Sequence, residues 1–376
     1  GAMLRKFLVV AFICLMAQGA WSENLKIGAL LDLSGDYADV GNAFLEGLSL
    51  AVDEVNQAGG VKGQQLELIV EDTHYNMAQV QSAAHKLLSI DKVSAAVITT
   101  YTEIKVAGPT FEAAHVPLIA LWDSAPQIEI LGDYIFGIGA WTPSAGDEAA
   151  TFARESLYGK TAAIINTNGE WSLDVSSIFR RKFEALGGRV IEEISLNPSD
   201  ADFKSAILRA KKLQPDVLYA PLADNIVPFF KQISMMRFQA PIVTSDVITE
   251  NALEVLKDAA EGIYQTQTAT PDTNATRHML ELYKLKYAKE CPMTLFTAWA
   301  YDSIGLLAKA VGESDSSSDG IKKGLYQIEN FPGASGTLTI SPEGSARTLE
   351  RMFQIRNGKF QLVRVEGSSL ILLGPR

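Results

Sequence analysis

The sequence is poor in the residues that build metal and catalytic centres. Its 376 residues include only two cysteines and four histidines. His74, His85, His115 and His278 are scattered, and no two have the i, i+4 spacing by which one helix face holds a metal ion. We therefore expect no metal site and no other cofactor.

Motifs for nucleophilic and nucleotide chemistry are also missing. The chain contains no GxSxG elbow and no GxxxxGK[ST] phosphate loop, and Cys291 has no evident histidine partner. Gly137-Ile-Gly139 begins like a dinucleotide fingerprint, but the third glycine is absent. We therefore expect no catalytic residues and a protein that is not an enzyme.

Basic charge is scarce as well. The chain carries 33 Lys and Arg residues against 44 Asp and Glu residues, which gives a formal net charge of −11. This balance argues against nucleic acid or an anionic membrane surface as a partner. It leaves a small-molecule ligand open, because the charge of a whole chain is not the charge of one site.

A short apolar run lies near the amino terminus. Residues 4–22, LRKFLVVAFICLMAQGAWS, combine a basic start, an apolar middle too short to span a bilayer comfortably, and a small-residue cleavage site. We expect a secretory signal peptide within residues 1–22, cleaved near Ser22 and Glu23, with two residues left by cloning before Met3. The mature protein would be periplasmic, and no later segment is long and apolar enough to cross a membrane.

Strand and helix signals alternate along the rest of the chain. Apolar runs bounded by turn residues predict buried parallel strands at 27–31, 66–70, 95–99, 117–121, 162–165, 217–220 and 242–244. Amphipathic segments predict helices near 44–55, 78–89, 145–157, 172–186, 202–213 and 225–236. Such a series predicts an α/β fold, whose ligands bind at the carboxyl ends of the strands. The loop expected at residues 34–41 follows the first strand.

Three breaks in this pattern are candidate crossings between two lobes. They lie at residues 137–144, 264–269 and 342–347. After the last of them, residues 352–364 predict a β-hairpin across Asn357-Gly358, a strong type I′ turn signal. The acidic, serine-rich run 313–319 is expected to form a solvated loop.

The segment from residue 26 to residue 72 also resembles a known family. LSGDYADVG, followed by a helix and then NQAGGVKG, is similar to the amino-terminal signature of type I periplasmic binding proteins, in the Leu/Ile/Val-binding branch. YGKTAAIINTNGEWSLDVSSIFRRKFEALGG, AAEGIYQTQ and LFTAWAYDSIGLLAKA resemble later parts of the same family. The resemblance therefore covers nearly the whole mature chain.

This resemblance implies two doubly wound, Rossmann-like α/β lobes joined by three crossover strands. It pairs residues 24–141 with 268–345 in the first lobe and residues 142–267 with 346–376 in the second. The implied function is that of an extracytoplasmic ABC-importer subunit, which captures an amino acid or related small carboxylate by hinge closure. Its partner would be an ABC permease of the inner membrane, and we expect a monomer.

The resemblance also places ligand contacts in the first lobe. Thr100, Tyr101 and Thr102 follow one strand, and Ser124 falls where members that bind amino acids use a hydroxyl to hold the ligand carboxylate. Tyr101 departs from the family, which usually has a serine at that place. Phe296 matches a side-chain wall. The threonines could instead act only as helix caps.

Two residues of the second lobe complete the implied site. Asp246 falls where the family places the acid that binds the ligand ammonium, and Trp171 falls where an aromatic ring covers the ligand. Aromatic rings supply a large and stiff contact area. The structural alternatives are a turn or cap carboxylate for Asp246 and a core position for Trp171.

Trp122 and Asp123 are the most individual feature, because relatives usually have small residues here. A carboxylate beside Ser124 would repel a ligand carboxylate unless a cation lay near it. Two hypotheses stay open. Either Asp123 points outward to backbone N–H groups and Ser124 still holds an amino acid, or Asp123 and Asp246 both face the cleft and the ligand is a cation or an amide.

Two other functions also stay open from the sequence. The same fold serves as a ligand sensor that signals to a receptor or regulator instead of a transporter. An α/β enzyme would need a nucleophile or a metal cluster, and neither is evident in this chain.

Overall fold

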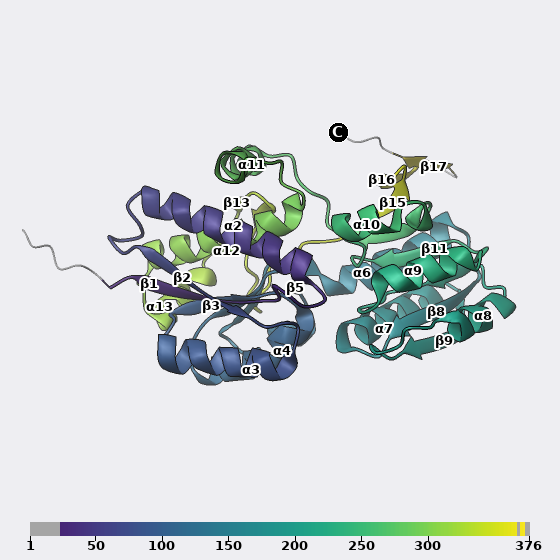
Figure 1. The fold of residues 1–376 in the computed structure, drawn as a ribbon, viewed down its shortest axis with the longest axis horizontal. Coiled ribbons are helices and arrows are strands. Elements are labelled where there is room, and N and C mark those ends of the chain that lie inside the picture. Colours follow the sequence, from purple (N-terminus) through teal and green to yellow (C-terminus); the bar gives the residue numbers. More distant parts are fainter. Residues whose placement is uncertain (1–22, 367–368, 373–376) are drawn as a thin grey trace, which may run out of the picture.

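The protein consists of two α/β lobes that lie side by side along its longest axis, as the computed structural model shows (Figure 1). The structure describes residues 23–366 and 369–372. Each lobe has one central sheet with buried apolar clusters on both of its faces. No helix in these residues is long and apolar enough to cross a membrane.

The first lobe is built on a five-stranded parallel sheet in the order β2-β1-β3-β4-β6. Its strands are β1 (Leu25–Leu31), β2 (Leu66–Asp72), β3 (Ala95–Ile98), β4 (Leu118–Ala120) and β6 (Ile135–Gly137). One face packs against α3 (Met77–Lys86), its π-helical extension (Leu87–Asp91), α4 (Tyr101–Ala113) and α5 (Pro126–Glu129). The other face packs against α2 (Ala38–Gln57), α12 (Thr294–Glu313) and α13 (Ser318–Leu325).

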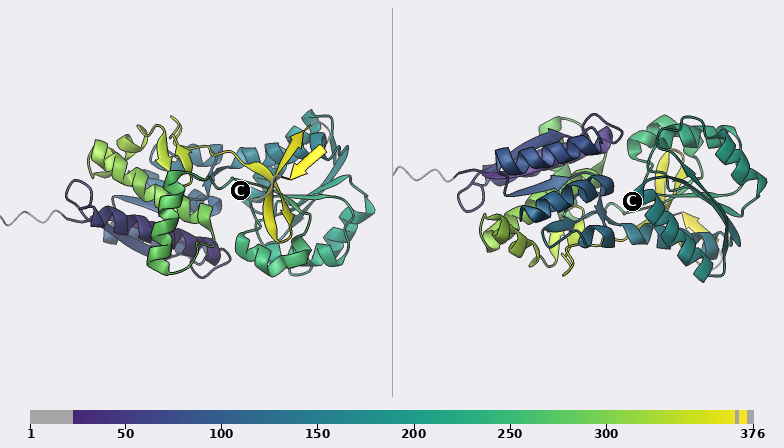
Figure 2. Two further views of the ribbon diagram at one scale, coloured as in Figure 1. Left: turned by 90° about the horizontal axis from the view of Figure 1, so that it is seen from above. Right: turned by 90° about the horizontal axis from the view of Figure 1, so that it is seen from below.

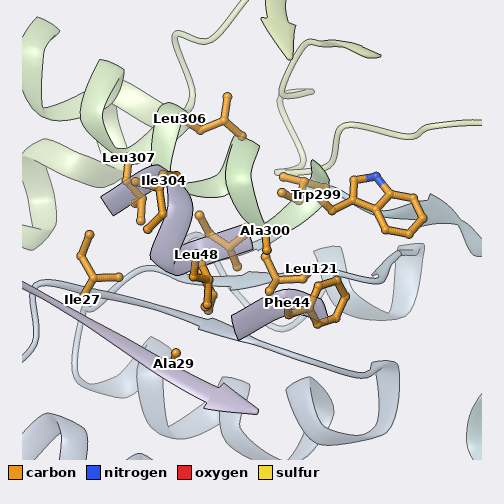
Figure 3. Close-up of a cluster of buried hydrophobic side chains, with 14 of the residues drawn as sticks. Ile27, Ala29, Phe44, Leu48, Leu121, Trp299, Ala300, Ile304, Leu306 and Leu307 are labelled. Carbon is orange, nitrogen blue, oxygen red and sulfur yellow. The ribbon is translucent and has the colours of Figure 1, made fainter. Parts of the chain in front are cut away.

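Helices α2 and α12 form the closest helix pair of this lobe. Phe44 and Leu48 of α2 share one buried cluster with Ala300 and Ile304 of α12 (Figure 3). Gly47 lies at their contact, where an added Cβ would meet the Thr297 carbonyl oxygen at 2.2 Å. Helix α11 (Asn274–Tyr287) and the small hairpin of β13 (Phe331–Gly333) and β14 (Gly336–Leu338) pack outside this pair.

The second lobe is built on an eight-stranded sheet in the order β17-β16-β15-β12-β11-β10-β8-β9. Its parallel strands are β8 (Thr161–Thr167), β9 (Arg189–Leu196), β10 (Val217–Tyr219), β11 (Ile242–Ser245) and β12 (Tyr264–Gln267). The antiparallel strands β15 (Arg351–Arg356), β16 (Lys359–Glu366) and β17 (Ser369–Leu372) extend one edge (Figure 2).

Helices cover both faces of this second sheet. One face packs against α6 (Thr142–Thr151), its π-helical extension (Phe152–Ser156) and α7 (Glu170–Ala185). The other face packs against α8 (Lys204–Lys212), α9 (Ile226–Met235), α10 (Glu250–Leu256) and a 3₁₀ turn (Lys257–Ala260).

The chain passes between the lobes at three places, and two of these segments are bonded together. The first contains β7 (Ala140–Trp141), which pairs in parallel with β5 (Asp123–Ser124) of the first lobe. Bridges join Gly137 to Ser345 and Ala140 to Thr348, so the first and last crossings run side by side. The remaining crossing leads from β12 to α11.

The structure confirms the expected α/β fold with its three crossings, and it confirms the hairpin across Asn357 and Gly358. The expected loop at residues 34–41 is too long, because α2 begins at Ala38. The Asp32 carboxylate accepts the backbone N–H groups of Gly35 (2.6 Å) and Tyr37 (2.7 Å), which tightens the turn before the helix.

Two further boundaries were wrong. Tyr264–Gln267 is a strand of the second sheet, so the crossing expected at residues 264–269 begins only after residue 267. Thr266 of this strand is polar, but it is buried and its hydroxyl donates to the Glu350 carboxylate at 3.0 Å. The solvated loop expected at residues 313–319 is shorter, because the Ser317 side chain caps α13, which already begins at Ser318. In both places the polar side chain has a specific hydrogen-bond partner, and its polarity wrongly suggested a segment outside the regular helices and strands.

The contact of α2 with α12 gives a first testable outcome. Gly47→Ala should lower the free energy of unfolding by about 1–3 kcal/mol, because the new methyl group must push the Thr297 backbone away. Gly312→Ala, in exposed helix at the far end of α12 with nothing within 4 Å, should be neutral or raise it by about 0.5–1 kcal/mol. Urea unfolding of both variants measures the difference, and equal effects would contradict this account of the packing.

Candidate functional site

A cavity lies between the two lobes. First-lobe residues on its wall are Tyr37, Tyr75, Thr100, Tyr101, Thr102, Trp122 and Asp123. Second-lobe residues on its wall are Trp171, Ala223, Asp246 and Val247. Each of them follows the carboxyl end of a parallel strand or lies at the start of the next helix, which is where open α/β sheets place ligands.

Seven of the nine site residues predicted from the sequence lie together at this cavity. They are Thr100, Tyr101, Thr102, Trp122, Asp123, Trp171 and Asp246. Ser124 and Phe296 do not line it. The Ser124 hydroxyl is fully buried and donates to the Gly139 carbonyl oxygen at 3.1 Å. Phe296 stands behind Trp122, with ring centroids 5.1 Å apart.

Four wall residues were missed by the sequence analysis. Tyr37 and Tyr75 follow β1 and β2, while Ala223 and Val247 follow β10 and β11. The signal that could have found them is the rule for strand ends, applied to every expected strand and not only to positions that matched a family pattern.

Aromatic rings form much of the cavity wall. The Tyr37 ring meets Tyr75 edge to face with centroids 4.9 Å apart, and it meets Trp122 in the same way at 5.4 Å. Tyr101 and Trp171 add two more rings. Edge-to-face packing is a favourable arrangement, so Tyr37, Tyr75 and Trp122 hold one another in place on the wall.

Two carboxylates share this space. The Asp123 carboxylate accepts the backbone N–H of Tyr101 at 3.1 Å, and burial raises the pKa of Asp123 to about 7. The Asp246 carboxylate accepts the Trp122 indole N–H at 2.8 Å across the lobes. Burial, and then the charge of Asp123, raise the pKa of Asp246 well above its ordinary value, against the lowering effect of the Trp122 bond.

A third acid lies behind this pair. Glu350 is buried and accepts the Thr266 hydroxyl at 3.0 Å. Burial, and next the charge of Asp246, raise the pKa of Glu350 well above its usual range. None of the ion pairs formed among the described residues includes Asp123, Asp246 or Glu350. The cavity floor is therefore acidic and without a protein counter-ion.

Helix α4 begins at the cavity with a complete capping box. The Thr100 hydroxyl accepts the Glu103 N–H at 3.2 Å, and the Glu103 carboxylate accepts the Thr100 N–H at 3.1 Å. The Thr100 hydroxyl also donates to Glu103 at 2.8 Å. Thr100 thus caps a helix, which was the structural alternative for the threonines, and its hydroxyl is already engaged within the protein.

Direct contacts hold the two lobes against each other around the cavity. The Tyr101 hydroxyl donates to the Asp174 carboxylate, and the Tyr37 hydroxyl donates to the Ala223 carbonyl oxygen. Other bonds join Thr249 to Asp39 at 2.8 Å and Lys105 to Glu170 at 2.5 Å. With the Trp122–Asp246 bond, these contacts define a closed arrangement of the lobes. Across the described chain, no group of three His, Cys, Asp or Glu residues could hold a metal ion.

Two lobes with a closed, polar and aromatic cavity between them define a protein that encloses a small ligand. Residues 24–359 match the periplasmic binding protein family, and the chain belongs to that family. The sequence is 22% identical over 355 residues to the "Leucine-, isoleucine-, valine-, threonine-, and alanine-binding protein" of Pseudomonas aeruginosa, covering 92% of this chain and 93% of that protein. It is 24% identical over 335 residues to the Leu/Ile/Val-binding protein BraC3 of Rhizobium johnstonii, covering 85% and 88%.

Solved structures share the fold. The branched-chain amino acid transporter substrate binding protein LivJ of Streptococcus pneumoniae, in complex with isoleucine, is 27% identical with a TM-score of 0.81, covering 94% of this chain and 100% of that one. The leucine binding protein LivK of Thermotoga maritima is 24% identical with a TM-score of 0.83, covering 92% and 98%.

Glu103 gives a test of the electrostatics at α4. Burial raises the pKa of Glu103 to about 7, so the folded protein holds a proton that the unfolded chain releases near its ordinary pKa of 4.5. This contribution to stability is present at low pH and is lost as the pH rises through about 7. Between about pH 5 and pH 8 the parent should lose on the order of 2 kcal/mol more unfolding free energy than Glu103→Gln.

The measurement is urea unfolding at several pH values. The quantity compared between variants is the slope of the free energy of unfolding against pH, not the absolute stability. Glu281→Gln, at an exposed position on α11, is the control and should keep the parental slope. Parallel curves for parent and Glu103→Gln would contradict the raised pKa of Glu103.

Proposed function

We propose that this protein is the extracytoplasmic solute-binding subunit of an ABC importer, which captures a small ammonium-bearing solute, an amino acid or a related compound, by closing two lobes over it. The observation that carries the proposal is the cavity whose wall comes from both lobes. An open arrangement would separate Trp122 from Asp246, so ligand contacts from both sides exist only in the closed state. A ligand therefore raises the closed population by its differential affinity for that state.

Asp246 and Trp171 are the second-lobe contacts in this proposal, and Tyr101, Thr102 and Asp123 are contacts from the first lobe. Asp246 is the group that would bind the ammonium, because it faces the cavity and its carboxylate has, among the described residues, only the Trp122 indole N–H as a hydrogen-bond partner. The ligands in the names of these relatives are amino acids (leucine, isoleucine and valine, with threonine and alanine in one of them), which supports a solute with an amino group.

Export, partner and lobe limits belong to the same proposal. The expected signal peptide and its cleavage site fall outside the described residues, and export to the periplasm rests on the sequence of residues 4–22. An inner-membrane permease would receive the closed form, which acts as a monomer. We draw the lobes at residues 24–141 with 268–345 and at residues 142–267 with 346–376.

Ligand capture is tested on the protein as purified from cells without refolding. Native mass spectrometry should detect a retained small molecule, and removing it by partial unfolding and dialysis should increase the radius of gyration in small-angle scattering. An unchanged radius, with the retained molecule present and then removed, would leave a rigid binding protein as the better description.

The tyrosine that bridges the lobes gives a quantitative outcome. Tyr101→Phe removes the bond to Asp174 but keeps the ring on the cavity wall. A hydrogen bond to a charged group is worth about 1.5–3 kcal/mol, and it is made only when the lobes are closed. The ligand-free variant should be more open in scattering, and the retained ligand should bind roughly tenfold or more weakly.

Tyr134→Phe is the matched control for this experiment. The Tyr134 hydroxyl also donates to an aspartate, Asp319, but both residues belong to the first lobe. This variant should keep the parental scattering and the parental affinity. If both variants behave alike, the bond between Tyr101 and Asp174 does not report on closure.

A further inference from the structure

We propose that the ligand is an organic ammonium cation without a carboxylate, such as an alkylamine or arylamine, held between Asp123 and Asp246. This inference rests on the proposed function, since it names the class of solute that the interlobe cavity encloses. Four features of the cavity and its mouth lead to it.

The first feature is the start of α4, the place in the cavity best suited to an anion. Helix amino termini bind anions through their free N–H groups and the helix dipole. Here the protein supplies its own carboxyl groups: Asp123 accepts the N–H of Tyr101 at 3.1 Å, and Glu103 accepts that of Thr100 at 3.1 Å. A ligand carboxylate would have to compete with two protein carboxylates for the same donors.

The second feature is the missing hydroxyl. Ser124, the expected hydroxyl contact for a ligand carboxylate, donates to Gly139 and does not reach the cavity. The Thr100 hydroxyl donates to Glu103. Thr102 keeps the one threonine hydroxyl on the wall that is not part of the capping box.

The third feature is a group of acids without a cation. Asp123 and Asp246 both face the cavity, Glu350 lies behind them, and the wall, as far as the structure describes it, includes no Lys, Arg or His. Lys105, whose ammonium lies 5.5 Å from the centre of the Tyr101 ring, pairs with Glu170 and is not on the wall. A buried carboxylate needs a cation or a proton. A cationic ligand supplies the missing charge, whereas a ligand carboxylate would add to the repulsion.

The wall rings fit this cation in a second way. Ammonium groups are attracted to the faces of Trp and Tyr rings, and the attraction is stronger when water is excluded. Tyr37 meets both Tyr75 and Trp122 edge to face, with its ring plane at 87° to each of theirs. The hydroxyl of Tyr37 is engaged across the lobes, which leaves its ring and not its polar end for the ligand.

The fourth feature is the mouth of the cleft. A groove shares Tyr37, Ala223 and Val247 with the cavity, and it presents the carboxylates of Asp36, Asp39 and Asp224 with no Lys, Arg or His among the described residues that line it. Such an entrance raises the local concentration of cations and repels anions. The entrance and the floor thus select the same charge.

The test compares matched compounds that differ only in the charged group. One set is 3-methylbutylamine, leucine, 4-methylpentanamide and 4-methylpentanoate; the second is 2-phenylethylamine, phenylalanine, 3-phenylpropanamide and 3-phenylpropanoate. Binding is measured by isothermal titration on protein freed of any retained molecule. In at least one set the amine should bind at least tenfold tighter than the amide, the amino acid and the acid.

Variants identify the groups responsible. Asp246→Asn and Asp123→Asn should each weaken binding of the amine about 30-fold or more. This is the lower end of the effect expected when one partner of a buried charge pair is removed. Asp258→Asn removes the same charge at an exposed position of the second lobe and should change affinity less than about twofold. Asp123→Ala leaves the Tyr101 N–H free to bind a ligand carboxylate, so it should raise the affinity for leucine relative to that for 3-methylbutylamine. If the Ala variant fails to fold, the Asn variant still tests the role of Asp123.

The outcomes separate this inference from the function on which it rests. If leucine or phenylalanine binds parental protein better than its amine and compacts it in scattering, the solute-binding function stands and the cation inference is overturned. If an amide binds best, it is overturned in favour of a neutral ligand. If no amine binds better than its matched amide, including the case in which nothing binds, the inference also fails, and the retained molecule in native mass spectra decides the function.

Discussion

Carboxylates held away from water without a positive partner constrain every other part of this cleft. Asp123, Asp246 and Glu350 converge where the lobes meet, and none has a counter-ion among the described residues. A buried charge without a partner destabilises the folded protein, and removing the partner of a buried charge pair does so strongly. The indole N–H of Trp122 and the backbone N–H of Tyr101 partly stabilise these carboxylates by hydrogen bonds. The rest of the stabilisation must come from bound protons or from a charge on the ligand, so ligand charge and lobe closure are linked.

Much of the fold could be predicted from the sequence because its signals are local. The first strand, helix and strand show short apolar runs and glycine turns, and Asn357-Gly358 marks the hairpin of β15 and β16. The strand β12 was misread because Thr266 looks polar, yet its hydroxyl has a buried partner in Glu350, which is distant in sequence. Such a partner is set by tertiary structure, and no local pattern contains it.

The positions of the site residues were predictable from the sequence, but the directions in which their side chains point were not. Strand ends and family resemblance brought seven of nine residues to the cavity, because both depend on topology. Whether a side chain there points into the cleft depends on competing hydrogen bonds. Ser124 turned to the carbonyl oxygen of Gly139, while Asp123 reached the Tyr101 N–H and still faces the cavity. Each hypothesis for Asp123 therefore matches one part of the geometry, since it bonds to backbone and shares the cleft with Asp246, and the ligand that separates the two hypotheses stays a prediction.

The pairing of β5 with β7 has a mechanical consequence. Asp123 belongs to a strand that is bonded directly to a crossing segment, and bridges tie that segment to the last crossing. A rotation of one lobe against the other about these strands would move the points near them least. The Asp123 end of the cavity would thus move little during closure, whereas Trp171, on a helix of the second lobe, would move further. The lobe movement then reaches the ligand as the arrival of Trp171 and Asp246 opposite an Asp123 that is already in place.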